Sequence, residues 1–459
     1  MASAADNPSE KYPAKAHAAK VAAHLASLDS VYRSATIYIE AQKTRLLEDN
    51  DEPEPFRQRR PFFYLSGVPL PDCSLTYQIP TSTLTLFIPP LDSDDVIWSG
   101  LPLSPSDALT KYDVDAVLTT SDLPSHLASL SPSKLLHLDN HDVPSATHLP
   151  GPTPEDKQAL RTALETSRIT KTPYEIALLR RANEITTAAH TAVLRSLKHK
   201  QNERELEAVF TERCIALGAP KQAYHGIFGS GTDAATLHYV HNDKALEGKL
   251  NLLVDAAAEY RCYCADVTRT MPLSGEFTRE SRAVYGIVER MQGESLGMLK
   301  AGVRWEDVHV RAHEVAIEGL LRLGILKGGS VKEIFERGTS VAFFPHGLGH
   351  YLGMDTHDVG GNPDYGDKDK RFRYLRVRGT LPKDSVVTVE PGVYFCRFIV
   401  EPYLKDEKHK EFIDEGVLDK YWDVGGVRIE DDILVTEDGY ENLTTAPKTV
   451  EDMERIINS

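Results

Sequence analysis

Long apolar segments are absent from this sequence. No run of about 18 apolar residues occurs, which is the length that a membrane-spanning helix requires. The opening stretch, M-A-S-A-A-D-N-P-S-E-K-Y-P-A-K, also lacks the apolar core of a secretory signal. We therefore expect a soluble protein with no membrane partner.

Cysteine is scarce as well. The 459 residues include five cysteines, an odd number without the regular spacing of a secreted disulfide framework. Only one residue separates Cys262 from Cys264, so this pair is neither a C-x-x-C redox motif nor a zinc knuckle. These features favour a reducing compartment and predict a cytoplasmic location.

Positively charged residues are fewer than negatively charged ones. The chain has 52 Lys and Arg against 68 Asp and Glu, for a formal net charge of −16. Phosphate backbones select basic surfaces, so we expect no nucleic-acid partner. Hydrophobic residues make up 41% of the chain, enough for a large core, and a chain of this length is expected to form two or three domains.

The N-terminal part, residues 1–171, is predicted to be a mixed α/β domain. Its alanine-rich segment 14–28 has a helical pattern. No cluster of catalytic residue types occurs in this part. The runs that read as strands are 35–40, 62–66, 74–79, 84–88 and 94–98.

A second domain is predicted to begin at Thr172 and to extend to residue 459. Thr172, Pro173 and Glu175 form the pattern of a capping box with proline at the first helical position, which opens a helix. One apolar face then recurs at helical spacing, through Ile176, Leu179, Ala182, Ile185, Ala189, Val193 and Leu197.

The rest of the second domain alternates between helical and β-rich patterns, which predicts an α+β fold with an antiparallel sheet. The segment 405–421 reads as an exposed insertion. Helices are predicted at 203–217, 279–300 and 305–323, and strands within 250–273, 384–401 and 424–436.

Two aspartates stand on β-rich runs that flank a short polar segment. A tight hairpin about Tyr260 and Arg261 would make Asp255 and Asp266 direct cross-strand partners. Two carboxylates placed so among apolar residues repel each other and need a cation. The alternative is that both are exposed aspartates at a turn.

Two glutamates occupy strand patterns further along the chain. Glu390 ends the apolar run V-V-T-V, and Glu430 lies on the same face as Arg428 by the period of two. Glutamate suits a buried strand poorly unless a partner neutralises it.

The stretch from Phe343 to Gly361 adds His346, His350 and His357 among glycines; each histidine alone would read as a surface residue of a loop. Together with the carboxylates, however, they form an oxygen-rich ligand set that suits Mn²⁺, with enough carboxylates to bridge two ions.

The order and spacing of these aspartates, histidines and glutamates along the chain match a known family. The eleven-residue step between the aspartates, followed by P-H-G-L-G-H at 345–350, E-P-G at 390–392 and R-I-E at 428–430, resembles the Xaa-Pro peptidases with the pita-bread fold, peptidase family M24B. This family includes prolidase and Xaa-Pro aminopeptidase. The resemblance covers 172–459 with strong motifs, and 1–171 is similar to the family's creatinase-like N-terminal domain.

The resemblance implies a catalytic domain with a curved, mainly antiparallel sheet covered by helices, holding two Mn²⁺ ions per subunit, with Co²⁺ or Zn²⁺ as alternatives. Asp266 and Glu430 would bridge the ions, and the subunits would form a homodimer. The implied ligands are Asp255, Asp266, His350, Glu390 and Glu430.

Further roles follow from the same resemblance. Glu390 would accept the proton of the attacking water, and His357 would contact the substrate and assist proton movement. His238 would also act on the substrate, and Arg428 would lie beside the last glutamate. Arg376 would hold the C-terminal carboxylate of a dipeptide.

His346 is predicted to support the site. The activity implied is hydrolysis of the N-terminal Xaa-Pro bond of short peptides with release of the first residue. The alternatives are a prolidase limited to Xaa-Pro dipeptides, a methionine aminopeptidase, and a metal-free peptide-binding homologue.

Overall fold

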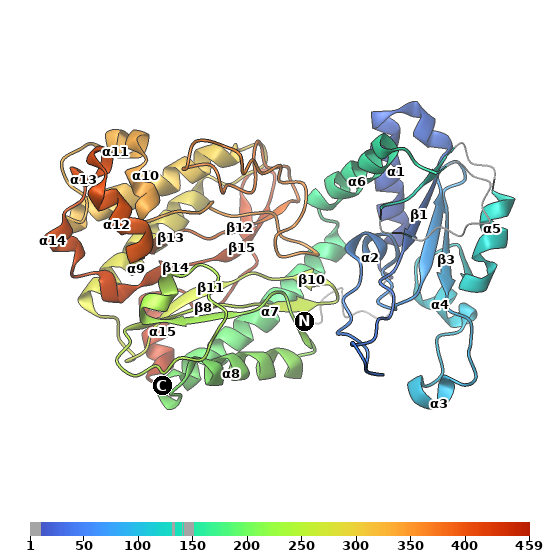
Figure 1. Ribbon diagram of the computed structural model, residues 1–459, viewed down its shortest axis with the longest axis horizontal. Helices are drawn as coiled ribbons and strands as arrows, with labels where there is room; N and C mark the ends of the chain where they lie inside the picture. The colour runs from blue at the N-terminus through green and yellow to red at the C-terminus, as the bar shows by residue number, and fades with distance from the viewer. Residues whose placement is uncertain (1–10, 131–133, 140, 142–150) are drawn as a thin grey trace. The chain divides into compact units, whose positions relative to one another are not determined.

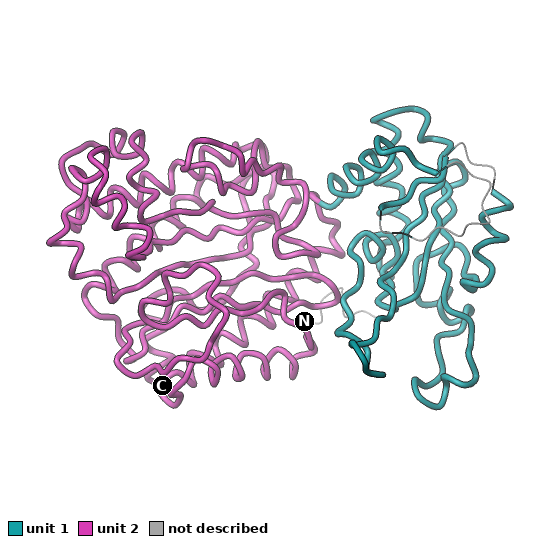
Figure 2. The backbone as a smooth tube through the Cα atoms, viewed as in Figure 1, with its two compact units in different colours: residues 1–168 teal, residues 169–459 magenta. Residues whose placement is uncertain are grey.

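The computed structural model describes residues 11–130, 134–139, 141 and 151–459. The chain divides into two compact units, residues 1–168 and 169–459 (Figure 2). Across the part of the chain that the structure describes, no helix has both the length and the apolar character needed to cross a membrane.

Unit 1 is built on a five-stranded mixed sheet in the order β4-β3-β2-β1-β5. Strands β1 and β3 of this sheet are labelled in Figure 1. The three central strands run antiparallel, and the outer two are parallel to their neighbours. The strands are β1 (Thr36–Glu40), β2 (Ser74–Gln78), β3 (Thr83–Ile88), β4 (Ala116–Thr119) and β5 (Leu135–Leu136). The helices are α1 (Ala14–Leu28), α2 (Arg60–Ser66), α3 (Val96–Ser99), α4 (Pro105–Lys111), α5 (Leu123–Ser129) and α6 (Pro154–Ile169).

Two strand predictions in unit 1 are wrong. The run 62–66 lies in α2, which begins at Arg60 and has Pro61 in its first turn. Nearly all of α2 is buried, so its sequence is apolar without a period and resembles a buried strand. The run 94–98 overlaps α3, whose Ile97 and Trp98 are exposed and therefore show no alternation between faces.

Unit 2 pairs its long helices. The predicted capping box of Thr172 and Glu175 is present and opens α7 (Pro173–Ser196), whose predicted apolar face is buried. Helix α7 packs against α8 and α9 packs against α10 (Figure 1). The other helices are α8 (Glu203–Ala216), α9 (Arg279–Gly297), α10 (Trp305–Leu323), α11 (Val331–Arg337), α12 (Arg397–Lys405), α13 (Glu407–Lys410), α14 (Glu415–Leu418) and α15 (Val450–Ile457).

The strands of unit 2 pair antiparallel in short sheets, ordered β10-β9-β6, β11-β8-β7, β12-β15-β16 and β13-β14. A bridge between Thr268 and Glu430 joins the edge of β11 to the chain beside β15. The strands are β6 (Lys221–Gln222), β7 (Ile227–Ser230), β8 (Asn251–Asp255), β9 (Ala258–Tyr260), β10 (Tyr263–Cys264), β11 (Thr268–Pro272), β12 (Val386–Val389), β13 (Gly392–Tyr394), β14 (Gly426–Arg428), β15 (Asp431–Val435) and β16 (Tyr440–Asn442).

The predicted aspartate hairpin exists, but its register differs. The turn residues are Arg261 and Cys262, both with positive φ, and not Tyr260 and Arg261. Moving the turn by one residue shifts the pairing by two, so Thr268 is opposite Asp255. Because the side-chain period is two, Asp266 remains on the same face as a diagonal neighbour.

Two further predictions in unit 2 need correction. The end of the predicted β run 384–401 belongs to α12. The segment 405–421 is not simply exposed, since it folds into α13 and α14 and buries Phe412, Ile413 and Leu418. These apolar residues are spaced irregularly among charges, which hid their contribution to the core.

Candidate metal centre and active site

One cavity of about 590 Å³ gathers the predicted functional residues. All ten of them line it, although they are spread over almost two hundred positions of the chain. They are His238, Asp255, Asp266, His346, His350, His357, Arg376, Glu390, Arg428 and Glu430.

The two aspartates reach the cavity from the β8–β11 sheet. Asp255 ends β8, where the Tyr224 hydroxyl donates to its Oδ1 at 2.5 Å and Arg428 Nη2 donates to its Oδ2 at 2.6 Å. Asp266 lies just before β11, and its backbone N–H donates to Asp432 Oδ2 at 3.0 Å. These bonds hold the carboxylate of Asp255 and the backbone of Asp266 at fixed positions.

The two glutamates enter from the opposite strands. Glu390 directly follows β12, and its N–H donates to the Leu348 carbonyl at 2.8 Å. Glu430 lies between β14 and β15 and accepts a hydrogen bond from Thr268 Oγ1 at 2.6 Å. Thr268 follows Asp266 by two residues, so both side chains lie on the same strand face. This face therefore supplies Asp266 as a candidate metal ligand and Thr268 as the group that orients Glu430.

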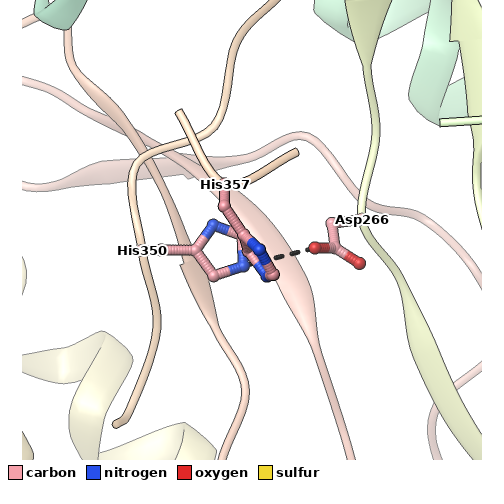
Figure 3. Close-up of side chains that lie close together, drawn as sticks. All are labelled: Asp266, His350 and His357. Carbon is pink, nitrogen blue, oxygen red and sulfur yellow. Dashed lines mark ion pairs between the residues drawn. The ribbon is translucent and has the colours of Figure 1, made fainter. Parts of the chain in front are cut away.

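His350 presents a bare ring nitrogen to the carboxylates. Its Nδ1 is 3.0 Å from the Tyr351 carbonyl oxygen and therefore carries the proton of the neutral ring. Nε2 then faces Asp266 Oδ2 at 3.3 Å (Figure 3). The same nitrogen lies 3.5 Å from Glu390 Oε1. A lone pair directed at carboxylate oxygens is unfavourable unless a cation lies between them.

The possible ligand atoms form three overlapping groups, each with its atoms within 4.8 Å of one another. Asp266, His350 and Glu430 each belong to two groups, which is the arrangement that ligands between two neighbouring ions would have. The groups are Asp266–His350–His357, His350–Glu390–Glu430 and Asp255–Asp266–Glu430.

The protonation behaviour of this cluster also fits a cation. Burial, reinforced by Asp255, raises the pKa of Asp266 well above its ordinary value, and burial with Asp266 does the same to Glu430. Burial raises the pKa of Glu390 to about 7. Burial lowers the pKa of His350, which keeps its ring neutral. The chain alone therefore does not stabilise the ionised form of these carboxylates, whereas a bound divalent ion would stabilise it.

The remaining histidines lie on loops. His357 packs edge-on against His350 with ring centroids 4.5 Å apart (Figure 3). Although the residue is partly exposed to solvent, desolvation of its ring within the cavity, reinforced by His350, lowers its pKa. His238 is exposed within the segment that follows β7. His346 is half-buried beside Glu390, with 3.8 Å between Nδ1 and Oε2, and its Nε2 lies 2.9 Å from the Tyr394 hydroxyl.

Arg428 is fully enclosed and links several of these groups. Besides Asp255, its guanidinium donates to Thr268 Oγ1 at 3.1 Å and to the Tyr394 hydroxyl at 2.9 Å. Neighbouring acidic groups raise its pKa well above the ordinary value despite burial, so it stays charged. Arg376 lines the cavity from the loop before β12.

Several residues of the site were not predicted from the sequence. Tyr224 and Tyr394 orient Asp255 and Arg428, yet both are ordinary core tyrosines by pattern. Tyr365 and Tyr374, each about half exposed, line the cavity. Only Thr268 carried a usable signal, because it lies two residues after Asp266 on the same strand face.

The glycines of 343–361 serve the protein's own backbone. A Cβ on Gly349 would collide with the Thr388 carbonyl oxygen, and one on Gly361 would collide with the Arg376 carbonyl oxygen. These residues let the histidine-bearing loop pack against β12 and against the segment that carries Arg376. The close backbone approach that these glycines allow is therefore to neighbouring segments of the chain.

Comparison with known proteins agrees with this site. Residues 177–437 match the model of metallopeptidase family M24, and residues 17–137 match that of the aminopeptidase P N-terminal domain. The chain belongs to metallopeptidase family M24, and the resemblance to its pita-bread Xaa-Pro peptidases is confirmed, as is the fold class. A divalent metal cofactor goes with this family and with the donor set described above.

The chain is similar to individual proteins over nearly its whole length. A "Probable Xaa-Pro aminopeptidase pepP" of Sclerotinia sclerotiorum is 59% identical over 98% of this chain and 82% of its own length. One of Botryotinia fuckeliana is 58% identical over 98% and 97%. Among solved structures, aminopeptidase P of E. coli with the inhibitor Pro-Leu is 28% identical, with a TM-score of 0.78 and coverage of 98% and 99%.

Proposed function

We propose that this chain is a metal-dependent exopeptidase that hydrolyses the N-terminal Xaa-Pro bond of peptides and releases the first residue. The observation that carries the proposal is the bare Nε2 of His350, which faces carboxylates inside the cavity where all ten predicted residues converge. Relatives 57–59% identical over nearly the whole chain are named as Xaa-Pro aminopeptidases.

The metal site would use one imidazole and four carboxylates. Oxygen-rich donors favour Mn²⁺, and two ions fit the overlapping groups, with Co²⁺ or Zn²⁺ as alternatives. When bound, the ions would activate a water and polarise the scissile carbonyl. The ligands would be Asp255, Asp266, His350, Glu390 and Glu430, with Asp266 and Glu430 bridging.

Glu390 is suited to accept the proton of the attacking water. Its Oε1 is directed at His350, which leaves Oε2 for the proton. His357, neutral because its pKa is lowered, would donate a hydrogen bond to the substrate. His238 would contact the substrate from the cavity rim.

The other residues would hold the substrate and the ligands. Arg376 would bind the C-terminal carboxylate of a short substrate, and Arg428 would fix Asp255. His346 would support the site through Tyr394. A hydrophobic first residue or the proline ring would lie against Leu237 and Ile399, which line the same cavity.

Peptide hydrolysis tests this function. The Mn²⁺-loaded protein is expected to release alanine from Ala-Pro-Pro and to leave Met-Ala-Ser intact. Cleavage of Gly-Pro alone would instead define a prolidase limited to dipeptides. Cleavage of Met-Ala-Ser would indicate a methionine aminopeptidase, and metal binding without any hydrolysis would indicate a peptide-binding homologue.

The domain roles, location and assembly complete the proposal. Residues 1–171 would be the creatinase-like domain and residues 172–459 the catalytic domain. All five cysteines are free thiols, in keeping with a cytoplasmic location. A homodimer would cover Ile97, Trp98 and Leu101, which are 81–84% exposed, and light scattering would measure it.

A further inference from the structure

Glu203 is a carboxylate in the interior of unit 2 that the proposed chemistry does not use. It is the first residue of α8 and is 0% exposed. Its Oε1 accepts hydrogen bonds from the N–H of Ser230 at 2.9 Å and from Ser230 Oγ at 2.6 Å. Its Oε2 accepts from the Tyr239 hydroxyl at 2.7 Å and from the N–H of Lys244 at 3.0 Å.

All four donors belong to one segment, residues 230–244. Ser230 ends β7 and Lys244 lies at the far end of the segment, so the carboxylate ties both ends to α8. The middle donor, Tyr239, directly follows His238. One buried side chain thus fixes the entry, the centre and the exit of the segment that carries a predicted substrate residue.

The turn that contains Tyr239 also restrains the orientation of His238. Residues 236–239 form a turn in which the Tyr239 N–H donates to the Thr236 carbonyl at 3.2 Å. The Tyr239 ring packs in an apolar cluster with Ile227, Ala234 and Leu253, while Leu237 and His238 line the cavity. An inward tyrosine anchored at its hydroxyl therefore sets the direction of the histidine beside it.

Helix capping does not account for Glu203. Asn202 already caps α8, since its Oδ1 accepts from the Arg204 N–H at 2.9 Å. The Glu203 carboxylate turns away from its own helix, although its place in the first turn favours a negative charge. The four hydrogen bonds that this buried carboxylate accepts fix geometry beyond what the helix needs.

We propose that Glu203 is a positioning residue that holds His238 at the substrate cavity. This role rests on the proposed function, because it presumes that His238 contacts the substrate. Glu203 itself does not touch the reacting groups. Its effect on hydrolysis is expected to pass entirely through His238.

A double-mutant cycle tests this. In Glu203→Gln the amide nitrogen cannot accept hydrogen bonds, so two of the four donors lose their acceptor. For the Mn²⁺-loaded full chain on Ala-Pro-Pro, kcat/KM is expected to fall about tenfold with bound Mn²⁺ unchanged. In a His238→Ala background the same substitution is expected to change kcat/KM by less than about twofold. Glu205→Gln, in the same helical turn, is the control and should leave both values unchanged.

The outcomes separate the two claims. If Glu203→Gln lowers kcat/KM equally in both backgrounds, the positioning role is wrong. If His238→Ala alone leaves kcat/KM unchanged, the proposed substrate role of His238 fails instead. Should Glu203→Gln not fold, Tyr239→Phe removes only the central donor and enters the same cycle. A loss that is independent of His238 would again overturn the positioning role.

Discussion

Asp266, Glu430 and His350 are buried on or beside strands, whereas His238 and His357 are exposed on loops of the same cavity. We call the first group, Asp266, Glu430 and His350, the strand side of the site. It is fixed by the ladder between β8 and β11 and by hydrogen bonds such as that from Thr268 to Glu430. The second group, His238 and His357, is the loop side, and its position depends on turns and a few buried anchors. Strand-borne groups are therefore arranged before any ligand arrives, and loop-borne groups can adjust to the substrate.

The loop side is not free of restraint. Asp358, directly after His357, forms a buried ion pair with Lys171, with 3.4 Å between Oδ2 and Nζ. Gly353 makes room for this pair, because a Cβ there would collide with Asp358 Oδ2. His238 and His357 thus each precede an anchored residue, Tyr239 and Asp358. This anchoring limits the motion of each histidine to its side chain and its turn.

The difference between the strand side and the loop side predicts how each should respond to substitution.

The largest effect is expected on the strand side, from Asp266→Asn. The amide keeps the shape but removes a negative charge shared by two ligand groups. We expect kcat/KM on Ala-Pro-Pro to fall by about 10³-fold or more and bound metal to decrease. Metal analysis and initial rates would measure both.

The matched control for this substitution is Asp438→Asn, which removes the same charge at an exposed position. It should leave metal content and rate unchanged. Full activity of Asp266→Asn with its normal metal content would show that the strand side does not hold the metal.

The next largest effect is expected on the loop side, from His357→Ala. The variant should keep its metal, because Asp266, Glu390 and Glu430 remain with His350 as ligands. Loss of a hydrogen-bond donor to the substrate is expected to lower kcat by about 10²-fold. Stopped assays at saturating peptide would separate kcat from KM.

Exposed His199, replaced by alanine, is the control for a general effect of removing a histidine. A fall in metal content of His357→Ala would mean that this residue is itself a ligand, as its place in one ligand group allows. The contrast between the two sides would then have to be redrawn.

Metal removal should make stability depend on pH. In the metal-free protein burial raises the pKa of Glu390 from its ordinary value of 4.5 to about 7, so the folded state binds this proton more tightly than the unfolded state. The free energy of unfolding is therefore expected to fall as pH rises from about 4.5 to about 7, by about 1–3 kcal/mol. Asp266 and Glu430, with pKa values also raised, act in the same direction.

Saturating Mn²⁺ should abolish this dependence, because the ion stabilises the ionised carboxylates. Urea unfolding at several pH values, with chelator and with Mn²⁺, provides the measurement. Stability of the chelated protein that rises with pH across this window would contradict the prediction.

Much of the strand side could be predicted from the sequence, because its ligand candidates sit at the ends of apolar strand patterns. Asp255, Asp266, Glu390 and Glu430 were all found this way. The exact register was not, since a turn at Arg261 and Cys262 differs by one residue from one at Tyr260 and Arg261, and either satisfies the pattern. The period of two preserved the shared face despite this error.

Long-range partners lay beyond sequence reasoning. Tyr224 meets Asp255 across 31 positions, and Glu203 meets Tyr239 across 36. Neither pairing leaves a local pattern, because it depends on how α8, β7 and β8 pack. The short helix α2 was missed for a related reason, since its apolar residues follow their buried surroundings and not a helical period.

The smallest effect is expected for Arg376→Ala, and it tests the adaptable character of the loop side. Arg376 lines the cavity from a loop. Its proposed contact with the substrate's C-terminal carboxylate would form with a dipeptide and not with a long peptide. KM for Ala-Pro should rise about tenfold with kcat nearly unchanged, and KM for a long Ala-Pro peptide should change little. Arg373→Ala, on the same loop but outside the cavity lining, is the control. An equal rise in KM for both lengths would place Arg376 among the groups that shape the whole site, so the loop side would then be as rigid as the strand side.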